Sequence, residues 1–471
     1  MNIFSFLLNI LLISFISCHY TSIKTKRHLI NLTNLKNTTN FLENEFLNQT
    51  NNTSKNLMES QKNLQYTMIQ LSNYKDIQYS GDIYVGTPYK KYSVIYDTGS
   101  NLFWLPSINC TLKCRNETNK YNPELSSSSI NLHIKKNISY AKGYIKGRLF
   151  KDKVCINKNS GFSFLYNKEL SIDNFKLIAA YKEKYLYRTI FDGIVGLGIN
   201  DEGDEYNSLI KTLYNQNKIS VPSFSFYLLS IKGNNKNHIS FNSSNDISRL
   251  YIGDILENNY INNLFKNKTK HCYLPEKNDY WLCQSNSIEL SLNNKSNIIN
   301  STSGVIFDTG TSYTIIPKND SQNIIDYFNN TLNKKCIITK YHQIVCECDS
   351  TKEFGNIKIF FDENNFYQIN FEDIIQYNHR FRNQCHFQML VDKIDFGIWV
   401  IGDSSLRNNL ITFNMDERKI SFVQNITDII DDNKIANNFF KKNNWISNAL
   451  FWIFIIGGIL LVVLLIIYIL K

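Results

Sequence analysis

The chain has 471 residues, of which 43% are hydrophobic, so it is long enough to form two or three domains with sizeable cores. Its formal net charge is +10, but the Lys residues are scattered among Asn residues, and no basic block is interleaved with aromatic side chains. Because a nucleic-acid site needs basic residues gathered on one face, we interpret this charge as a solvated surface and expect no nucleic-acid partner.

The first 18 residues form an apolar stretch that ends in small side chains near Cys18. This pattern predicts a secretory signal peptide over residues 1–18, although the usual basic residue is missing from its start. An uncleaved signal anchor is the alternative. In either case the body of the chain enters an oxidising compartment, where cysteines pair. We therefore expect a protein of the secretory pathway whose body is lumenal or extracellular.

Residues 19–72 are polar and rich in Asn, with stretches compatible with a helix, such as residues 57–71. A segment of this composition cannot bury a core of its own, so we interpret it as a pro-segment or a stalk.

From residue 73 to residue 425 the pattern changes to short β-rich runs separated by Asn, Gly, Ser and Lys turns. Many short strands with turn signals between them predict an all-β body. The strands that we expect are 92–96, 131–134, 144–150, 224–229, 249–252, 358–361, 399–402, 410–413 and 419–423.

The C-terminal end is apolar. A polar linker, residues 426–445, precedes an almost unbroken hydrophobic run over residues 446–470, with Trp445 and Trp452 near its start. The run is long enough to cross a bilayer as a helix, and tryptophans are typical of the membrane interface. We therefore expect a transmembrane helix that tethers the body to a membrane. A glycolipid-anchor signal, whose tail is removed, is the alternative.

One tripeptide occurs twice in matching context. Residues 94–100 read Val-Ile-Tyr-Asp-Thr-Gly-Ser, and residues 305–311 read Val-Ile-Phe-Asp-Thr-Gly-Thr. A lone copy is most simply an aspartate in a β-turn, but two copies with the same apolar lead-in and a following hydroxyl residue are not expected by chance.

The surroundings of the two copies repeat as well. Each copy is followed by an apolar strand that ends at Pro106 or Pro317, and later by an apolar run that reaches a glycine, at residues 191–198 and 399–403. A glycine there permits a close backbone approach to a buried strand. We interpret the body as one lobe duplicated, with an N-terminal lobe over residues 73–232 and a C-terminal lobe over residues 233–425, joined near residues 225–248.

Two carboxylates within a few ångström of each other cannot both ionise easily, so the pair holds one proton. Such a pair positions a water, with one carboxylate as base and the other as proton donor to a carbonyl oxygen. We therefore predict that Asp97 and Asp308 form a catalytic pair. Six neighbours support them: the glycines allow tight turns, the hydroxyl residues that follow donate to the carboxylates, and the threonines join the turns. These neighbours are Thr98, Gly99, Ser100, Thr309, Gly310 and Thr311.

With these features the chain resembles the pepsin-like aspartic proteases over roughly residues 74–423. Residues 81–88 resemble the family's strand before the first catalytic loop, and Trp104 follows the first Asp-Thr-Gly at the family's spacing. Residues 138–143 resemble the flap, which implies that Tyr140 closes over bound peptide beside Gly143 and that Trp104 supports its hydroxyl. The Asn- and Lys-rich composition makes the plasmepsins of apicomplexan parasites the nearest-looking subgroup.

The sequence departs from the family at the flap. Ala141 stands where the family usually has glycine, and Lys142 adds charge at the tip. A side chain at residue 141 could stiffen the hairpin, so flap detail and peptide preference need not follow the family. Asn101 also stands where a small residue is common. None of these departures removes a predicted catalytic group.

The resemblance implies a bilobal all-β fold and an endopeptidase that hydrolyses peptide bonds in peptide or protein substrates. It also implies a zymogen that works as a monomer without a cofactor. A catalytically inactive member that only binds peptide is the alternative. A surface adhesion or structural protein is a second alternative, although it does not explain two matched turns.

Nine cysteines remain outside the signal. By the resemblance, one disulfide follows the first catalytic strand and another lies in the second lobe, while two more pairs suit local hairpins. The leftover Cys155 is either free or intermolecular. A zinc site at Cys336, His342, Cys346 and Cys348 is disfavoured by their spacing and by the compartment, so we expect no metal. The expected pairs are Cys110–Cys114, Cys272–Cys283, Cys336–Cys346 and Cys348–Cys385.

Overall fold

The computed structural model describes the chain from strand β1 onward. The predicted signal, the predicted membrane span and almost all of the predicted pro-segment and linker lie outside the described residues. No helix in the described part is both long enough and apolar enough to cross a bilayer. The structure describes residues 67–424 and 426, except 111–113, 115–117, 141–142, 157–169, 185–189, 200–207, 232–246, 254, 257–258, 277 and 379–382.

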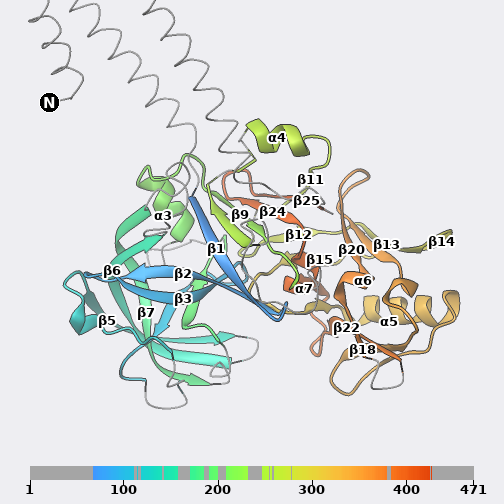
Figure 1. Ribbon diagram of the computed structural model, residues 1–471, viewed down its shortest axis with the longest axis horizontal. Coiled ribbons are helices and arrows are strands. Elements are labelled where there is room, and N and C mark those ends of the chain that lie inside the picture. The colour runs from blue at the N-terminus through green and yellow to red at the C-terminus, as the bar shows by residue number, and fades with distance from the viewer. Residues whose placement is uncertain are drawn as a thin grey trace, which may run out of the picture. The chain divides into compact units, whose positions relative to one another are not determined.

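The prediction of an all-β body is confirmed (Figure 1). The largest sheet has 13 strands in the order β11-β25-β24-β9-β10-β1-β2-β3-β8-β4-β7-β6-β5. Its strands are β1 (Thr67–Tyr74), β2 (Gln78–Val85), β3 (Lys90–Asp97), β4 (Phe103–Pro106), β5 (Ile130–Tyr140), β6 (Gly143–Ile156), β7 (Leu170–Lys184), β8 (Gly193–Gly196), β9 (Ser223–Tyr227), β10 (Ser248–Ile252), β11 (Lys270–Tyr273), β24 (Leu410–Asn414) and β25 (Lys419–Val423).

Two smaller sheets come from the residues between β11 and β24. A sheet of eight strands follows the order β12-β15-β23-β16-β22-β18-β17, with β21 paired to β22, and a sheet of four follows β14-β13-β19-β20. The eight are β12 (Leu282–Gln284), β15 (Gly304–Phe307), β16 (Thr314–Ile316), β17 (Cys336–Ile338), β18 (Gln343–Glu347), β21 (Ile375–Asn378), β22 (Gln384–Val391) and β23 (Ile398–Ile401). The four are β13 (Ser287–Leu292), β14 (Lys295–Ile299), β19 (Asn356–Phe360) and β20 (Phe366–Asn370).

The described helices are short and connect strands. Their apolar residues, such as Leu209, Ile210 and Leu213 on α3, are buried on one side. The helices are α3 (Leu209–Asn215), α4 (Asn259–Phe265), α5 (Lys318–Asp326), α6 (Phe371–Ile374) and α7 (Asp403–Leu406), with the single turns η1 (Pro123–Leu125), η3 (Tyr327–Thr331) and η4 (Thr351–Glu353).

Strand β1 corrects one expectation. The stretch over residues 57–71 is compatible with a helix, yet its described end belongs to a strand that pairs with β2 and β10. The reason is a period of two: Thr67, Ile69 and Leu71 are buried, while Gln70 is exposed. This alternation suits a half-buried strand and outweighs local helix compatibility.

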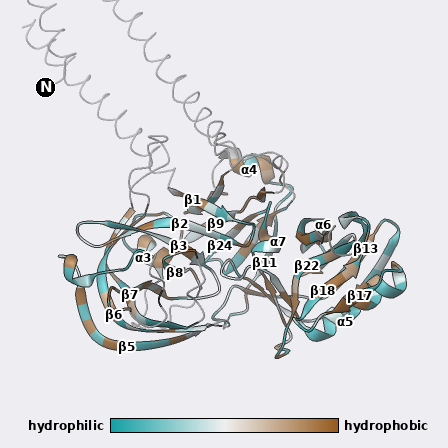
Figure 2. Cartoon of the chain, turned by 60° about the horizontal axis from the view of Figure 1, so that its bottom comes forward, coloured by the Kyte–Doolittle hydropathy of each residue, from teal (hydrophilic) through white to brown (hydrophobic). Residues whose placement is uncertain are grey.

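All nine predicted strands occur, seven of them within two residues of their expected bounds, whereas β5 and β6 each extend six residues beyond the predicted end. Central strands such as β4, β8, β9 and β24 are buried along their whole length, as expected for strands covered on both faces. The outer strand β5 has no buried residue and alternates between exposed and partly buried side chains over residues 135–140, and Figure 2 shows brown and teal segments along it.

The duplicated layout is visible in the pairing of strands. In the first half, β3 lies parallel to β8, and β4 lies antiparallel to β8. In the second half, β15 lies parallel to β23, and β16 lies antiparallel to β23. Gly196 and Gly402 occupy matching places, where an added Cβ would lie 2.3 Å from the Leu102 nitrogen and 2.5 Å from the Thr311 oxygen. Each half therefore holds its Asp-Thr-Gly turn against a close backbone crossing.

The 13-stranded sheet draws on both predicted lobes. Strands β10, β11, β24 and β25 come from residues that we assigned to the C-terminal lobe, yet they hydrogen-bond in the same sheet as β1 to β9. Strand β24 pairs directly with β9, from Leu410 opposite Tyr227 to Asn414 opposite Ser223. The two ends of the region predicted to join the lobes, near residues 225 and 248, therefore lie in β9 and β10 of this shared sheet.

Candidate active site

Each predicted catalytic aspartate stands where a buried strand ends. Asp97 is the last residue of β3 and is 5% exposed, and Asp308 directly follows the last residue of β15. The backbone of each turn is fixed by the neighbouring strand. Leu197 donates to the Asp97 carbonyl oxygen at 2.7 Å, and Asp308 donates to the Ile401 carbonyl oxygen at 3.0 Å.

The two carboxylates are bound in the same way by their own turns. For Asp97, the Gly99 N–H donates to Oδ1 at 2.8 Å and the Ser100 hydroxyl donates to Oδ2 at 2.5 Å. For Asp308, the Gly310 N–H donates to Oδ1 at 2.7 Å and the Thr311 hydroxyl donates to Oδ2 at 2.7 Å. Hydrogen bonds to a charged carboxylate favour ionisation and fix its orientation.

The threonines between them join the two turns. The Thr98 N–H donates to the Thr309 hydroxyl oxygen at 3.1 Å, and the Thr309 N–H donates to the Thr98 hydroxyl oxygen at 3.0 Å. Each hydroxyl then donates across to the other half, Thr98 to the Phe307 carbonyl at 2.7 Å and Thr309 to the Tyr96 carbonyl at 2.6 Å. All four bonds are buried, so no water competes for them.

This crossing brings each carboxylate against the glycine of the opposite turn. A Cβ added to Gly99 would lie 2.7 Å from both oxygens of Asp308, and one added to Gly310 would lie 2.2 Å from Oδ1 of Asp97. Both glycines are therefore required by space, because any side chain would displace a carboxylate. The same contacts show that Asp97 and Asp308 face each other across the two turns.

The electrostatics of Asp97 follow from this arrangement. Burial raises the pKa of Asp97 well above its usual range, and the negative charge of Asp308 raises it further. The hydrogen bonds from Ser100 and Gly99 act in the opposite direction but do not offset burial. A carboxyl group held in this way keeps its proton at a pH where an exposed aspartate is ionised, which suits a group that donates a proton.

The residues of the predicted flap lie beside this pair. Tyr140 ends β5 and pairs with Gly143, which begins β6, so the hairpin closes over residues 141–142, outside the described residues. The Tyr140 ring packs against the cluster that contains Trp104. Burial and the charge of Asp97 both raise the pKa of the Tyr140 hydroxyl. Neither that hydroxyl nor Trp104 Nε1 hydrogen-bonds to another described residue.

A charged group behind the second turn has no role in our sequence interpretation. Asp403, the first residue of α7, is buried, and its pKa is raised well above the usual range by burial and by Asp308, with Arg407 acting to lower it. Arg407 itself is 5% exposed, lies 3.6 Å from Asp76 Oδ2 and donates to the Gln388 side chain at 2.7 Å. The available signal was a pair of opposite charges, four residues apart, that directly follows Gly402.

The structure contains the four expected disulfides, which join Cys110 to Cys114, Cys272 to Cys283, Cys336 to Cys346 and Cys348 to Cys385. The cysteines of the disfavoured zinc set are therefore split between two bridges. Cys155 is buried in β6 and belongs to none of the four.

One cluster of metal-ligand type occurs among the described residues. It combines Cys110, Cys114 and the buried Glu183. Its two sulfur atoms are bonded to each other, so they are not thiolate ligands. Burial also raises the pKa of Glu183 to about 7, which reduces its charge.

Comparison with known proteins gives the family. A model described as eukaryotic aspartyl protease matches residues 78–425, which is most of the chain. The chain belongs to the eukaryotic aspartyl protease family. Both Asp-Thr-Gly turns and the predicted flap lie inside the matched range, so the resemblance to pepsin-like proteases is confirmed, while the plasmepsin subgroup stays a prediction from composition.

Individual members of the family are similar over most of their length. Pepsin A of Suncus murinus is 26% identical over 354 residues, which cover 74% of this chain and 81% of the relative. Pregnancy-associated glycoprotein 2 of Bos taurus is 28% identical over 403 residues, covering 84% and 92%. Cathepsin D of Dictyostelium discoideum is 24% identical over 363 residues, covering 76% and 85%.

Proposed function

We propose that this chain is an active aspartic endopeptidase in which Asp97 and Asp308 hydrolyse a peptide bond together. Membership of the aspartyl protease family supports a peptidase in general. The observation that carries the proposal is the crossed packing of the two turns, in which each carboxylate lies against the glycine of the other. The second carboxylate is therefore close enough to influence the first, as the raised pKa of Asp97 reflects.

The proposed mechanism follows from the single proton of the pair. Asp308 takes a proton from a water molecule as the water oxygen bonds to the peptide carbonyl carbon, and Asp97 donates its proton to the carbonyl oxygen. The resulting tetrahedral intermediate collapses when the C–N bond breaks: the leaving nitrogen takes the proton now on Asp308, and one hydroxyl of the intermediate returns its proton to Asp97, which restores the single proton of the pair. The reciprocal threonine hydrogen bonds hold both carboxylates in place throughout.

Three further parts of the proposal rest on the sequence. The apolar start and the four disulfides support the secretory pathway, where an oxidising lumen favours disulfides. The apolar run over residues 446–470 supports a membrane tether, with the body outside the cytoplasm. The polar segment before β1 supports synthesis as a zymogen, and peptide or protein chains are the proposed substrates.

A single set of variants tests catalysis. The purified full-length protein is incubated with a peptide library at acidic pH, and products are identified by mass spectrometry. We expect the wild type to cleave and Asp97→Asn to lose at least a thousandfold in kcat/KM. Asp173→Asn is the matched control, because its side chain is 74% exposed and far from the turns in sequence.

Inhibitor binding separates the active enzyme from an inactive peptide-binding member. A statine-type peptide should bind the wild type tightly and Asp97→Asn weakly, because its hydroxyl interacts with the carboxylate pair. Wild-type protein that binds such peptides but cleaves none in the library would support the inactive alternative. Cleavage that persists unchanged in Asp97→Asn would exclude the proposed mechanism.

A further inference from the structure

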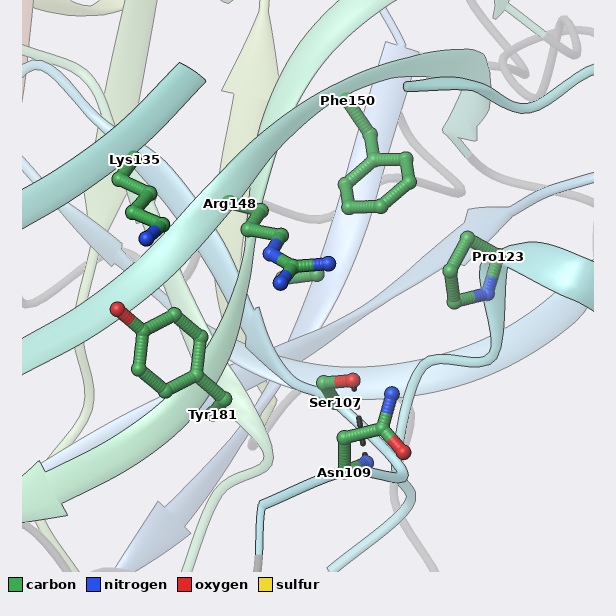
Figure 3. A pocket seen from close by; sticks show the side chains of 8 residues that line it. Ser107, Asn109, Pro123, Lys135, Arg148, Phe150 and Tyr181 are labelled. Carbon is green, nitrogen blue, oxygen red and sulfur yellow. Dashed lines mark hydrogen bonds between the residues drawn. The ribbon is translucent and has the colours of Figure 1, made fainter. Parts of the chain in front are cut away.

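A cavity outside the candidate active site lies on the strands that carry the flap. It has a volume of about 440 Å³, and none of its lining residues belongs to the candidate active site. Strands β5, β6 and β7 contribute Lys135, Arg148 and Tyr181, and the segment after β4 contributes Ser107 and Asn109 (Figure 3). Its size is within the range of ligand-binding pockets.

This cavity and the flap tyrosine are on opposite faces of the same strands. Leu149 and Ile178 pack in the cluster with Trp104, against which Tyr140 rests. Successive side chains of a strand point to opposite faces. Leu149 is paired with Ile178 across β6 and β7, and the adjacent pair is Arg148 with Ala179. The side chains of this adjacent pair therefore point away from Tyr140, and both residues line the cavity.

Two cations line this cavity from neighbouring strands. Lys135 lies directly opposite Arg148 in the register of β5 and β6. Like charges in directly opposed positions destabilise a sheet. Within the part of the chain that the structure describes, neither side chain forms an ion pair or a hydrogen bond, and no carboxylate lines the cavity. An anion between the two side chains would offset their repulsion.

Irregularities in two strands shape the cavity. Between Asn131 and Lys135 the register of β5 shifts, and His133 has a positive φ of 60°. In β7, Tyr181 is an extra residue between the partners of Lys146 and Gly147. Such β-bulges re-aim side chains and occur often beside functional sites. In Figure 3 the side chains of Lys135, Arg148 and Tyr181 gather on one side, opposite Ser107 and Asn109.

The positive charge continues beyond the cavity. Lys146 shares a strand face with Arg148 and lies directly opposite Lys182, so a second pair of cations follows the first. Tyr144 comes next on that face, with the amino groups of Lys146 and Lys184 each 5.9 Å from its ring centre. From Arg148 to Tyr144 the strip extends about 13 Å along β6.

Negative charge on these strands is scarce. Among the described residues, two Lys or Arg residues lie on β5, four on β6 and three on β7, against three carboxylates on the same strands. Asp152 and Glu183 are buried, and Asp173 lies 3.6 Å from Lys153. The cavity and strip therefore present an almost uncompensated positive surface.

We propose that the cavity and its strip bind an acidic peptide segment. One carboxylate enters the cavity between Lys135 and Arg148. There the planar guanidinium group of Arg148 can donate two parallel hydrogen bonds to the two carboxylate oxygens. The next carboxylates of the segment lie along Lys146 and Lys182. A free oxyanion would use only the cavity, whereas a chain of carboxylates uses both parts. Binding at this site does not depend on the proposed peptidase activity.

Fluorescence anisotropy tests this site directly. Fluorescein-labelled hexaglutamate is titrated with full-length Asp97→Asn protein, which prevents cleavage by the proposed carboxylate pair, and a neutral Gly-Ser peptide is the control ligand. The site variant is Lys135→Gln with Arg148→Gln. The matched variant is Lys151→Gln with Lys176→Gln, because these two lysines are also direct cross-strand partners but line no part of the cavity. Thermal unfolding of both variants verifies their folding.

The two variants remove the same charge, so only position distinguishes them. We expect the site variant to weaken hexaglutamate binding at least tenfold and the matched variant to weaken it less than twofold, with binding that falls as salt rises. Equal losses in the two variants, or binding no tighter than that of the neutral peptide, would overturn the proposal. Inorganic phosphate that binds the wild-type cavity more tightly than hexaglutamate would identify a free oxyanion instead, and would also overturn it.

Discussion

Thr98 and Thr309 are 211 residues apart in the sequence, yet the backbone N–H of each donates to the hydroxyl oxygen of the other. Their hydroxyl groups donate onward to the carbonyl oxygens of Phe307 and Tyr96. The two halves of the site are thus joined at the residue next to each aspartate. A change at either threonine alters the stability of the junction and the spacing of the carboxylates together.

We predict that Thr98→Val impairs both stability and activity. Valine has the shape of threonine but leaves the Thr309 N–H and the Phe307 carbonyl without their partner. An unpaired buried group costs about 1–3 kcal/mol in the free energy of unfolding. Displaced carboxylates should lower kcat roughly 10- to 100-fold. Urea unfolding and peptide cleavage measure the two effects.

Thr412→Val is the matched control for that prediction. The Thr412 hydroxyl is buried and hydrogen-bonds to the Ser225 hydroxyl at 2.8 Å, between β9 and β24. We expect a similar loss of stability but unchanged kcat for the folded molecules. If both valine variants retain full kcat, the threonine crossing does not position the carboxylates.

The pH dependence of stability should report the proton on Asp97. Its pKa is raised in the folded protein, so the folded chain keeps this proton at a pH where the unfolded chain has lost it. Stability from this group is therefore fully present below about pH 4, where the unfolded aspartate is also protonated, and is lost as the pH rises toward the raised value of about 8. Asn cannot ionise, so Asp97→Asn should gain stability relative to the wild type between about pH 4 and about pH 8.

Chemical unfolding at a series of pH values measures this difference. The control is Asp82→Asn, because the Asp82 side chain is 47% exposed and pairs with Lys91 at the surface. That variant should differ from the wild type by a small amount and lack the upward trend. A constant difference between Asp97→Asn and the wild type across the range would contradict the raised pKa.

Gly310→Ala should abolish activity by steric displacement. The new Cβ would lie 2.2 Å from Oδ1 of Asp97, so the carboxylate or the turn has to move. We expect kcat to fall at least 100-fold, because small displacements of catalytic groups are costly. Gly304→Ala is the control: its Cβ would lie 3.2 Å from the flexible Leu282 side chain and in ordinary contact with Ile398, at 3.6 Å. Equal activity of the two variants would show that the crossed packing is not required.

The disulfides should differ in their contribution to stability. The Cys348–Cys385 bridge closes a separation of 37 residues, whereas Cys110–Cys114 closes one of 4. Loop-closure entropy then gives about 4 kcal/mol for the long loop and about 2 kcal/mol for the short one. Urea unfolding of the two Cys→Ala double variants should show this order. The reverse order would mean that loop entropy does not dominate here.

The local pattern of apolar residues and turn signals was sufficient to predict many of the strands. The strand predicted over residues 419–423 has the same bounds in the structure, because its apolar residues are flanked by turn signals. The 15-residue strand β7, by contrast, was not predicted. Its register shifts twice against β6, so its side chains do not keep a period of two. Bulges depend on the partner strand and leave little trace in the sequence.

The same distinction applies to the candidate site. The residues of both turns could be predicted as site residues from the sequence, because each turn carries the full motif on consecutive residues. Their catalytic roles stay a prediction. The contact of Arg407 with Asp76 spans 331 residues and could not be named. The cavity between Lys135 and Arg148 could not be named either, because its register depends on the bulge in β5.

The shared sheet also sets an order of events during synthesis. Strands β24 and β25 complete the 13-stranded sheet beside β9, although more than 180 residues separate paired side chains such as Ser225 and Thr412. Contacts of such long range form slowly and only after both partners have left the ribosome. The first Asp-Thr-Gly turn is therefore made long before the sheet that supports it can close. The two turns of the proposed catalytic pair therefore gain the support of a complete sheet only after almost the whole described body has been translated.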